Sequence, residues 1–439
     1  MIRSFELLHH RIATRSIDNF ISRAYSISKH YGLDVQKYKR SLLDFINLMN
    51  EYHFKPTFPV TAIVLEKNPS LFRYLQNLGV EFAIHGYLHI DYSNMDNRIL
   101  VDHLKCAKEI FKSYNISFTG FRYPYLCKDQ TKIDLLAESN FEWDSSQVVS
   151  WYLSNKDILP ENMWQNYQRI LATYQPEDNE TCFTLPYFIN KMVELPVVVP
   201  DDEILIERLR LNDGEQLRSI WENMLHDTIR NREMMVLQVH PERFQNYRSA
   251  LKHLLTLTNM RADIWCTPLG EIAKWWKERA GFRFQIKSVS KRRYHVESNA
   301  STRATILIKN SLFNTDQKID NYTIISGNHW EISSPVKPVI GIDPNSNKQV
   351  IKFFEGEGFP CEIISDPNHA YAFTVNHPGK LTYEDKRNFL VSIDNCTNPL
   401  LRFWRWPNSY KACFAVTGDI DSVNIWDFFT RFYGRTTKK

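Results

Sequence analysis

Short apolar runs alternate with amphipathic segments between about residues 16 and 276 of this 439-residue chain. Buried strands give apolar runs, and helices that cover a sheet give amphipathic segments. The predicted strands are 58–65, 80–84, 118–121, 194–199, 235–239 and 264–266. The predicted helices are 68–78, 97–114, 132–139, 213–232, 241–259 and 269–277. The alternation predicts an α/β layer or barrel within a main domain at 1–279.

Period-two alternation and β-branched residues replace the helical periodicity beyond this domain. The strands predicted there are 283–289, 303–308, 322–325, 348–354, 362–365 and 370–375. We therefore expect an inserted antiparallel β domain, sandwich-like, at 280–400. The final segment, 401–439, returns to the first pattern, with a buried strand at 412–417 and an amphipathic helix at 423–433.

Charge and composition exclude several classes of protein. A net charge of +4 without a clustered basic stripe argues against a nucleic-acid partner. The N-terminus lacks the apolar core of a secretory signal, and no run reaches the ~20 apolar residues of a membrane span. We therefore expect a cytoplasmic protein. The seven scattered cysteines contain no C-x-x-C pair, which predicts free thiols rather than disulfides or a thiolate metal cage.

A pair of histidines, His85 and His89, follows the apolar run 80–84. On a helical turn, side chains four residues apart face the same side, so both imidazoles could reach one metal ion. A lone histidine is more often a hydrogen-bonded structural residue. A zinc site also needs a third protein ligand and an open position for water.

Two acids, Asp419 and Asp421, directly follow the predicted strand 412–417. Sites in α/β folds are built at the carboxyl ends of strands. Two nearby carboxylates can divide labour, one binding metal and the other taking a proton, because each charge shifts the other's pKa. The alternative is an acidic cap on the following helix.

Two further strand ends carry polar groups. Arg122 could hold a carboxylate by a bidentate pair, and Pro124 fixes a loop whose next N–H, that of Tyr125, could point into the site. His240 follows a buried strand and could act as general acid or base, or simply cap a helix. Asp144 is a plausible partner that would raise the pKa of His240.

The order and spacing of these motifs resemble those of the polysaccharide deacetylases, the carbohydrate esterase family with the NodB homology domain. The matching motifs are His85-x-x-x-His89, Arg122-x-Pro124-Tyr125, Trp143-Asp144-Ser145-Ser146 and Leu237-x-x-His240-Pro241. The resemblance covers about 50–276 and the C-terminal segment, and it implies a distorted (β/α) barrel. One departure is Gly86, where the family commonly has Ser or Thr.

A second departure concerns the family's first motif, Thr-Phe-Asp-Asp or Thr-x-Asp-x-Asp, which residues 1–55 lack. It stands instead at Thr417-Gly418-Asp419-Ile420-Asp421. The resemblance therefore implies a circular permutation, in which the C-terminus supplies the first barrel strand. The alternative is that 401–439 begins a second, truncated module.

The resemblance also implies a mechanism. A divalent metal, most simply Zn²⁺, would be bound by Asp421, His85 and His89, and would lower the pKa of its water toward ~7. Asp419 would be the general base.

The remaining roles follow from the same resemblance. Arg122 would keep Asp419 ionised, and the N–H of Tyr125 would help to stabilise the oxyanion. His240, kept protonated by Asp144, would protonate the leaving amine of an N-acetylated sugar. The motifs do not separate N-deacetylation from deformylation, from O-acetyl ester hydrolysis or from carbohydrate binding without catalysis.

Overall fold

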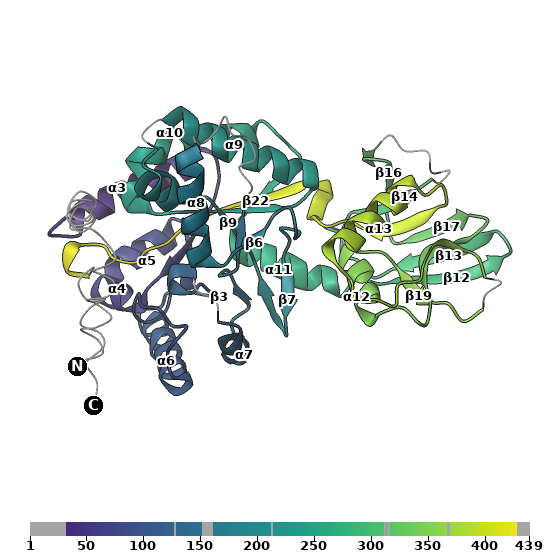
Figure 1. The fold of residues 1–439 in the computed structure, drawn as a ribbon, viewed down its shortest axis with the longest axis horizontal. Coiled ribbons are helices and arrows are strands. Elements are labelled where there is room, and N and C mark those ends of the chain that lie inside the picture. The colour runs from purple at the N-terminus through teal and green to yellow at the C-terminus, as the bar shows by residue number, and fades with distance from the viewer. Residues whose placement is uncertain are drawn as a thin grey trace.

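The computed structural model describes residues 32–126, 129–151, 161–211, 214–310, 313, 317–366 and 369–427 (Figure 1). Most of the helix predicted at 423–433 lies outside them. Within the described chain, twelve strands form one curled sheet, in the order β6-β5-β9-β10-β22-β1-β2-β3-β4-β8-β7, with β11 beside β22. Helices lie around it (Figure 1). The expected α/β barrel-type fold is confirmed.

The sheet is built from short strands, and nearly all of its pairings are parallel. They are β1 (Thr57–Val60), β2 (Glu81–Ile84), β3 (Gly120–Phe121), β4 (Trp143–Asp144), β5 (Val148–Ser150), β6 (Glu177–Asp178), β7 (Tyr187–Ile189), β8 (Met192–Glu194), β9 (Val197–Val199), β10 (Met234–Val239), β11 (Ile264–Cys266) and β22 (Ala412–Gly418). The covering helices are α3 (Gln36–Glu51), α4 (Ala62–Lys67), α5 (Pro69–Asn77), α6 (Asn97–Ser113), α7 (Gln130–Glu138), α8 (Glu161–Tyr174), α9 (Gly214–Asn231), α10 (Phe244–Asn259) and α11 (Leu269–Ala280).

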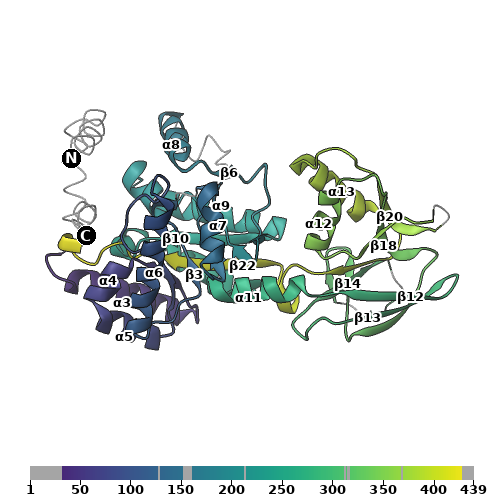
Figure 2. The same ribbon diagram turned by 90° about the horizontal axis from the view of Figure 1, so that it is seen from below.

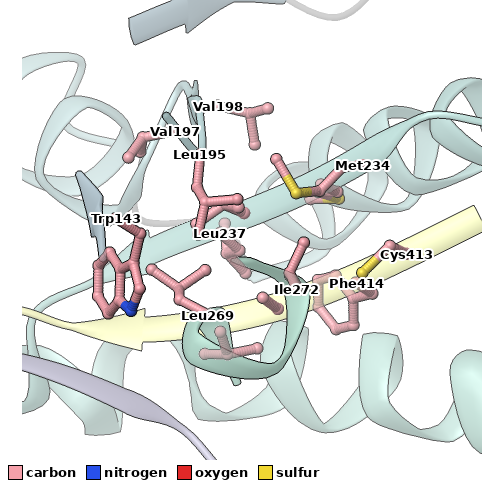
Figure 3. Packing of buried hydrophobic residues seen from close by; sticks show 14 of the residues in the cluster. Trp143, Leu195, Val197, Val198, Met234, Leu237, Leu269, Ile272, Cys413 and Phe414 are labelled. Carbon is pink, nitrogen blue, oxygen red and sulfur yellow. The ribbon is translucent and has the colours of Figure 1, made fainter. Parts of the chain in front are cut away.

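The C-terminal strand β22 lies in the centre of this sheet. It pairs in parallel with β10, from Met234 opposite Cys413 to Val239 opposite Gly418, and it also pairs with β1 and β11. Every residue of β10 and β22 is buried, because helices or other strands cover both faces. Figure 3 shows side chains of these two strands packed against Leu269 and Ile272 of α11. Strand β22, near the end of the described residues, therefore completes a sheet whose other strands come from the first part of the chain.

Two predicted strands differ from the structure. Residues 58–65 are extended only as far as Val60, after which α4 begins, and its first amide N–H groups donate to the carbonyls of Gly86 and Tyr87. Residues 194–199 form two strands, because Pro196 has no N–H for a ladder and separates β8 from β9.

The accessory region contains three sheets (Figure 2). Two are antiparallel, β12-β13-β17 and β15-β16-β14-β21. The third, β19-β18-β20, is parallel. Their strands are β12 (Phe284–Ser290), β13 (Arg293–Ser298), β14 (Ile306–Lys309), β15 (Lys318–Ile319), β16 (Tyr322–Ile325), β17 (His329–Ser333), β18 (Lys337–Ile342), β19 (Cys361–Ile363), β20 (Tyr371–Val375) and β21 (Leu400–Phe403). The prediction of an antiparallel domain is right for two sheets and wrong for the third.

The third sheet carries two helices, α12 (Lys348–Glu357) and α13 (Tyr383–Asn395). The strand predicted at 348–354 is wrong, since this segment is the first part of α12. The Asn347 side chain caps the helix by accepting from the Gln349 N–H, and Gly358 ends it in the left-handed conformation.

A buried charge cluster joins the accessory region to the barrel. Glu357 accepts from Arg402 at 2.5 Å and from Arg405 at 2.8 Å, and Arg405 also donates to the carbonyl of Asn231 at the end of α9. Trp404 and Trp406 are buried beside this cluster, which makes them packing residues rather than an exposed sugar-stacking pair. None of the helices in the described part of the chain has both the length and the apolar composition of a membrane span.

Candidate metal centre and catalytic site

The two histidines lie on the loop that follows β2. The expected helical turn is wrong: residues 85–90 are not helical, and Gly86 has a φ of +80°. The loop nevertheless brings the imidazoles together, with ring centroids 5.2 Å apart. Both side chains are buried.

A third potential ligand comes from the far end of the sequence. The Asp421 carboxylate lies 3.3 Å from Nε2 of His85 and 3.1 Å from Nε2 of His89. All three ligand atoms lie within 4.8 Å of one another. The position of β22 between β10 and β1 produces this meeting, because parallel strand ends gather at one edge of the sheet.

The three side chains fit a divalent cation. Nδ1 of His85 lies 2.9 Å from the carbonyl oxygen of Arg122, which can only accept, so Nδ1 carries the proton. In the neutral imidazole Nε2 then presents a lone pair toward the Asp421 carboxylate, and a cation bound between them would satisfy both acceptors. Imidazole and carboxylate ligands with one such constrained tautomer are typical of zinc sites.

Asp419 lies beside this group and is held by Arg122. Nη1 of the fully buried Arg122 donates to Asp419 at 2.6 Å and to the Thr417 hydroxyl at 2.8 Å. Its other nitrogens donate to the carbonyl and hydroxyl of Ser145. Since four of its five N–H groups make these bonds, the guanidinium has one orientation. Oδ2 of Asp419 remains 3.8 Å from Nε2 of His85.

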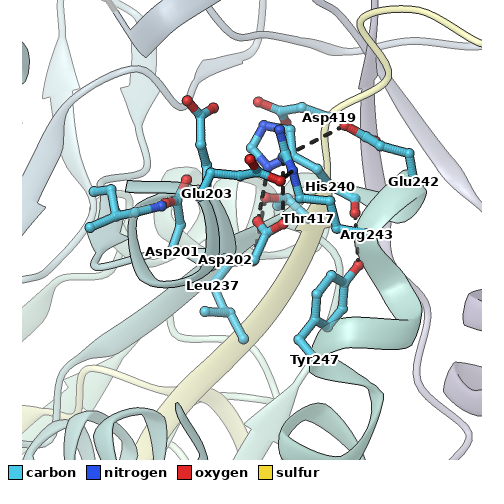
Figure 4. A network of polar contacts seen from close by, with 12 residues as sticks. Asp201, Asp202, Glu203, Leu237, His240, Glu242, Arg243, Tyr247, Thr417 and Asp419 are labelled. Carbon is cyan, nitrogen blue, oxygen red and sulfur yellow. Dashed lines mark hydrogen bonds and ion pairs between the residues drawn. The ribbon is translucent and has the colours of Figure 1, made fainter. Parts of the chain in front are cut away.

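His240 pairs with a carboxylate that the sequence reasoning missed. Its Nδ1 lies 2.9 Å from Oδ1 of the fully buried Asp202 (Figure 4). Burial lowers the pKa of His240, but the charge and the hydrogen bond of Asp202, together with the charge of Glu242, raise it well above its usual range. His240 makes no side-chain capping bond.

The prediction that Asp144 orients His240 is wrong, since Asp202 has that contact. Asp144 accepts from the Ser146 hydroxyl at 2.6 Å, and that hydroxyl accepts from the N–H of Tyr123. The order of strands explains the difference: β9, which precedes Asp202, pairs with β10, whereas β4 lies five strands away along the sheet. Asp202 carries a sequence signal that could have found it, because two acids follow the apolar run of β9 after a single proline.

The neighbourhood of Asp202 is crowded with charge. Asp201, Asp202 and His240 also have ligand atoms within 4.8 Å of one another. Burial, and then the charge of Asp202, raises the pKa of Asp201 to about 7. Nη1 of Arg243 lies 3.6 Å from Oδ2 of Asp202. Because Asp202 already pairs with His240 and Arg243, we interpret these charged residues as the groups that orient the His240 imidazole and favour its protonated form.

Tyr125 stands at the rim of the metal centre. The residue is 48% exposed, and its ring centroid lies 4.4 Å from that of His89. The backbone of Tyr125 is left-handed, with φ 62° and ψ 13°, a costly conformation for a residue other than glycine. All eight site residues predicted from the sequence lie in the described part of the chain, and the position expected for Asp144 at Nδ1 of His240 belongs to Asp202.

Comparison with known proteins gives a partial match. Residues 36–143 match the family model described as polysaccharide deacetylase. This range contains His85, His89 and Arg122. No curated protein matches the chain.

Three solved structures are among those similar to this chain. A protein of Mycobacterium smegmatis described as a polysaccharide deacetylase is 20% identical, with a TM-score of 0.41, over 59% of this chain and 83% of the other. PuuE allantoinase is 16% identical (TM-score 0.43; 55% and 74%). A protein of Pseudomonas aeruginosa PAO1, also described as a polysaccharide deacetylase, is 17% identical (TM-score 0.42; 55% and 75%). The family match is confined to residues 36–143, which is less than half of the chain.

Proposed function

We propose that this protein is a metal-dependent hydrolase that removes an N-acetyl group from an amino sugar in a polysaccharide or its precursor. The convergence of His85, His89 and Asp421 is the observation that carries the proposal. The family match agrees with it, because a deacetylase acts on a carbon–nitrogen bond other than a peptide bond. The carbohydrate is the proposed partner.

The three ligands would hold a divalent metal, with Zn²⁺ the first choice for two imidazoles and a carboxylate. When bound, the ion would activate a water molecule and polarise the acetyl carbonyl. Asp419 lies beside the ligands without being one of them, so it is the proposed base that takes the proton of the attacking water. Its bond to Arg122 fixes the carboxylate for that transfer.

Proton delivery to the leaving group falls to His240. The imidazolium, favoured by Asp202, would give its Nε2 proton to the sugar nitrogen as the carbon–nitrogen bond breaks. The products are acetate and a free amino sugar. The backbone N–H of Tyr125 is the proposed donor to the acetyl oxygen during attack. The cytoplasmic location expected from the sequence remains a prediction, and it favours a nucleotide- or lipid-linked sugar precursor.

A pair of variants tests this function. Protein stripped with a chelator and reloaded with Zn²⁺ is incubated with N-acetylated oligosaccharides, and released acetate is measured. His89→Ala is expected to lose metal and turnover together, whereas Asp419→Asn is expected to keep the metal and lose turnover. His253→Ala, which removes a histidine on α10 paired with Glu222, is the matched control. Undiminished acetate release by His89→Ala would refute the assignment, and release of formate or of ester-linked acetate alone would favour the alternative substrates.

A further inference from the structure

A buried tyrosine lies directly beneath the loop that carries the two histidines. The hydroxyl oxygen of Tyr92 accepts from the N–H of Tyr87 at 3.0 Å and from the N–H of Leu88 at 3.3 Å. Tyr92 is 1% exposed. Both amides belong to the segment between His85 and His89, so one side-chain atom bonds the backbone that sets their separation.

The hydroxyl of Tyr92 uses all of its bonding capacity there. A phenol has two lone pairs and one proton, and the two amides fill the lone pairs. The proton can go to the Leu88 carbonyl at 3.2 Å or to Nδ1 of His103 at 3.3 Å. The Leu88 carbonyl belongs to the loop itself, whereas His103 lies in the first half of α6. The hydroxyl can therefore bond within the loop or connect the loop to α6.

Gly86 and Tyr92 depend on each other. A Cβ at position 86 would lie 2.7 Å from the Tyr92 hydroxyl oxygen and 2.8 Å from Cε2 of its ring, both shorter than real contacts. The φ of +80° at Gly86 disfavours any other residue as well. The loop therefore has no room for a side chain at position 86, because the Tyr92 ring fills that space.

We propose that Tyr92 is a positioning residue of the metal centre, which holds the His85–His89 loop in its ligand conformation through the amides of Tyr87 and Leu88. The inference rests on the proposed metal site. Groups that orient metal ligands at one remove typically change metal affinity by about 10- to 100-fold when they are lost. Tyr92 acts on the backbone of the loop rather than on the imidazoles themselves.

The test removes one oxygen atom, that of the Tyr92 hydroxyl. Tyr92→Phe keeps the ring against Gly86 but leaves the two amides without their acceptor. In competition with a chromogenic chelator at fixed pH, its Kd for Zn²⁺ is expected to rise about 10- to 100-fold. The matched control is Tyr167→Phe, which removes a buried hydroxyl that donates to the Trp151 carbonyl, and its Kd is expected to stay within about twofold of the wild type.

Rescue distinguishes positioning from general damage to the fold. Saturating Zn²⁺ is expected to restore the kcat of Tyr92→Phe, because the ligands and Asp419 are intact. An unchanged Kd in folded Tyr92→Phe overturns the inference, and so does a loss of kcat that excess metal does not reverse.

Hydrogen exchange in the metal-free wild-type protein tests the hydrogen bonds from the loop amides to Tyr92 without a variant. The amides of Tyr87 and Leu88 are expected to exchange slowly, and exchange as fast as in an open loop overturns the inference even if Tyr92→Phe does not fold. If the wild type binds no Zn²⁺, the proposed function fails, while slow exchange of these amides still supports the contact.

Discussion

Asp202→Asn separates the proposed proton donor from its counter-charge. The substitution keeps the size of the side chain and an oxygen that can accept from Nδ1 of His240, so the 2.9 Å contact can survive. What it removes is the negative charge that does most to raise the pKa of His240 against the effect of burial. An opposite charge at this distance is worth about 1–3 pKa units, or about 1.4–4 kcal/mol.

The expected effect follows from the sign of this shift. His240 must be protonated to act as acid, and its pKa falls in the variant, so the alkaline limb of kcat/KM moves to lower pH by about 1–3 units. Above both pKa values this predicts a loss of about 10- to 1000-fold in kcat/KM, and the loss disappears below both of them.

Acetate release measured between pH 5 and 9 gives both profiles, with thermal unfolding as the check on the fold. Asp201→Asn is the comparison, because it removes a buried carboxylate from the same segment without touching the Nδ1 contact, and it is expected to shift the limb less. An alkaline limb at the same pH in wild type and Asp202→Asn would refute the proposed role of His240.

Three further predictions concern stability and binding. Because the pKa of His240 is raised in the folded state, its pair with Asp202 stabilises the fold fully below the unfolded pKa of about 6.5. This stabilisation is lost as the pH rises through the folded pKa, so the difference in Tm between wild type and Asp202→Asn is expected to narrow in alkaline buffer. A difference in Tm that widens there would contradict the pairing. Glu357→Gln leaves Arg402 and Arg405 buried without their carboxylate and is expected to cost about 3–5 kcal/mol in urea unfolding, and a cost under about 1 kcal/mol would show that the cluster is not a buried ion pair. Trp406→Ala is expected to lose about 3–5 kcal/mol of stability while the KM of the folded enzyme is unchanged, whereas a raised KM would show that Trp406 contributes to substrate binding.

The sequence was sufficient where function lies at the end of a strongly apolar strand. The family resemblance implied the placement of Asp421 beside His85, and a buried strand at 412–417 fits it, because parallel strand ends meet at one edge. The resemblance also implied the Arg122–Asp419 contact, with which the complementary charges agree. These contacts depend on which strands share a sheet, and not on details of the loops.

The partner of His240 could not be obtained in the same way, because it depends on which strand is next to β10. Motif order favoured Asp144, but β9 occupies the adjacent position and places Asp202 there. A one-dimensional pattern does not give the order of strands in a curled sheet. Gly86 likewise looked like a lost hydroxyl, and only the structure shows Tyr92 in the space beside it.

The misassigned helix α12 shows the limit of periodicity over short segments. In Lys348–Phe354, Val350 and Phe354 are both buried, and a spacing of four suits one helix face as well as one strand face. The aromatic and β-branched residues favoured a strand. The capping Asn347 and the terminal Gly358 are helix signals, and in the structure they mark the beginning and the end of α12.

The central claim is that the two ends of this chain build one metal centre, and zinc content with zinc X-ray absorption tests it most directly. For the wild type, we predict one Zn²⁺ per chain with two imidazole nitrogens at ~2.0–2.1 Å and one carboxylate oxygen at ~2.0–2.2 Å. Asp421→Ala, folded by circular dichroism, is predicted to lose the ion. Retention of zinc by Asp421→Ala with unchanged affinity and an unchanged absorption spectrum would contradict the account.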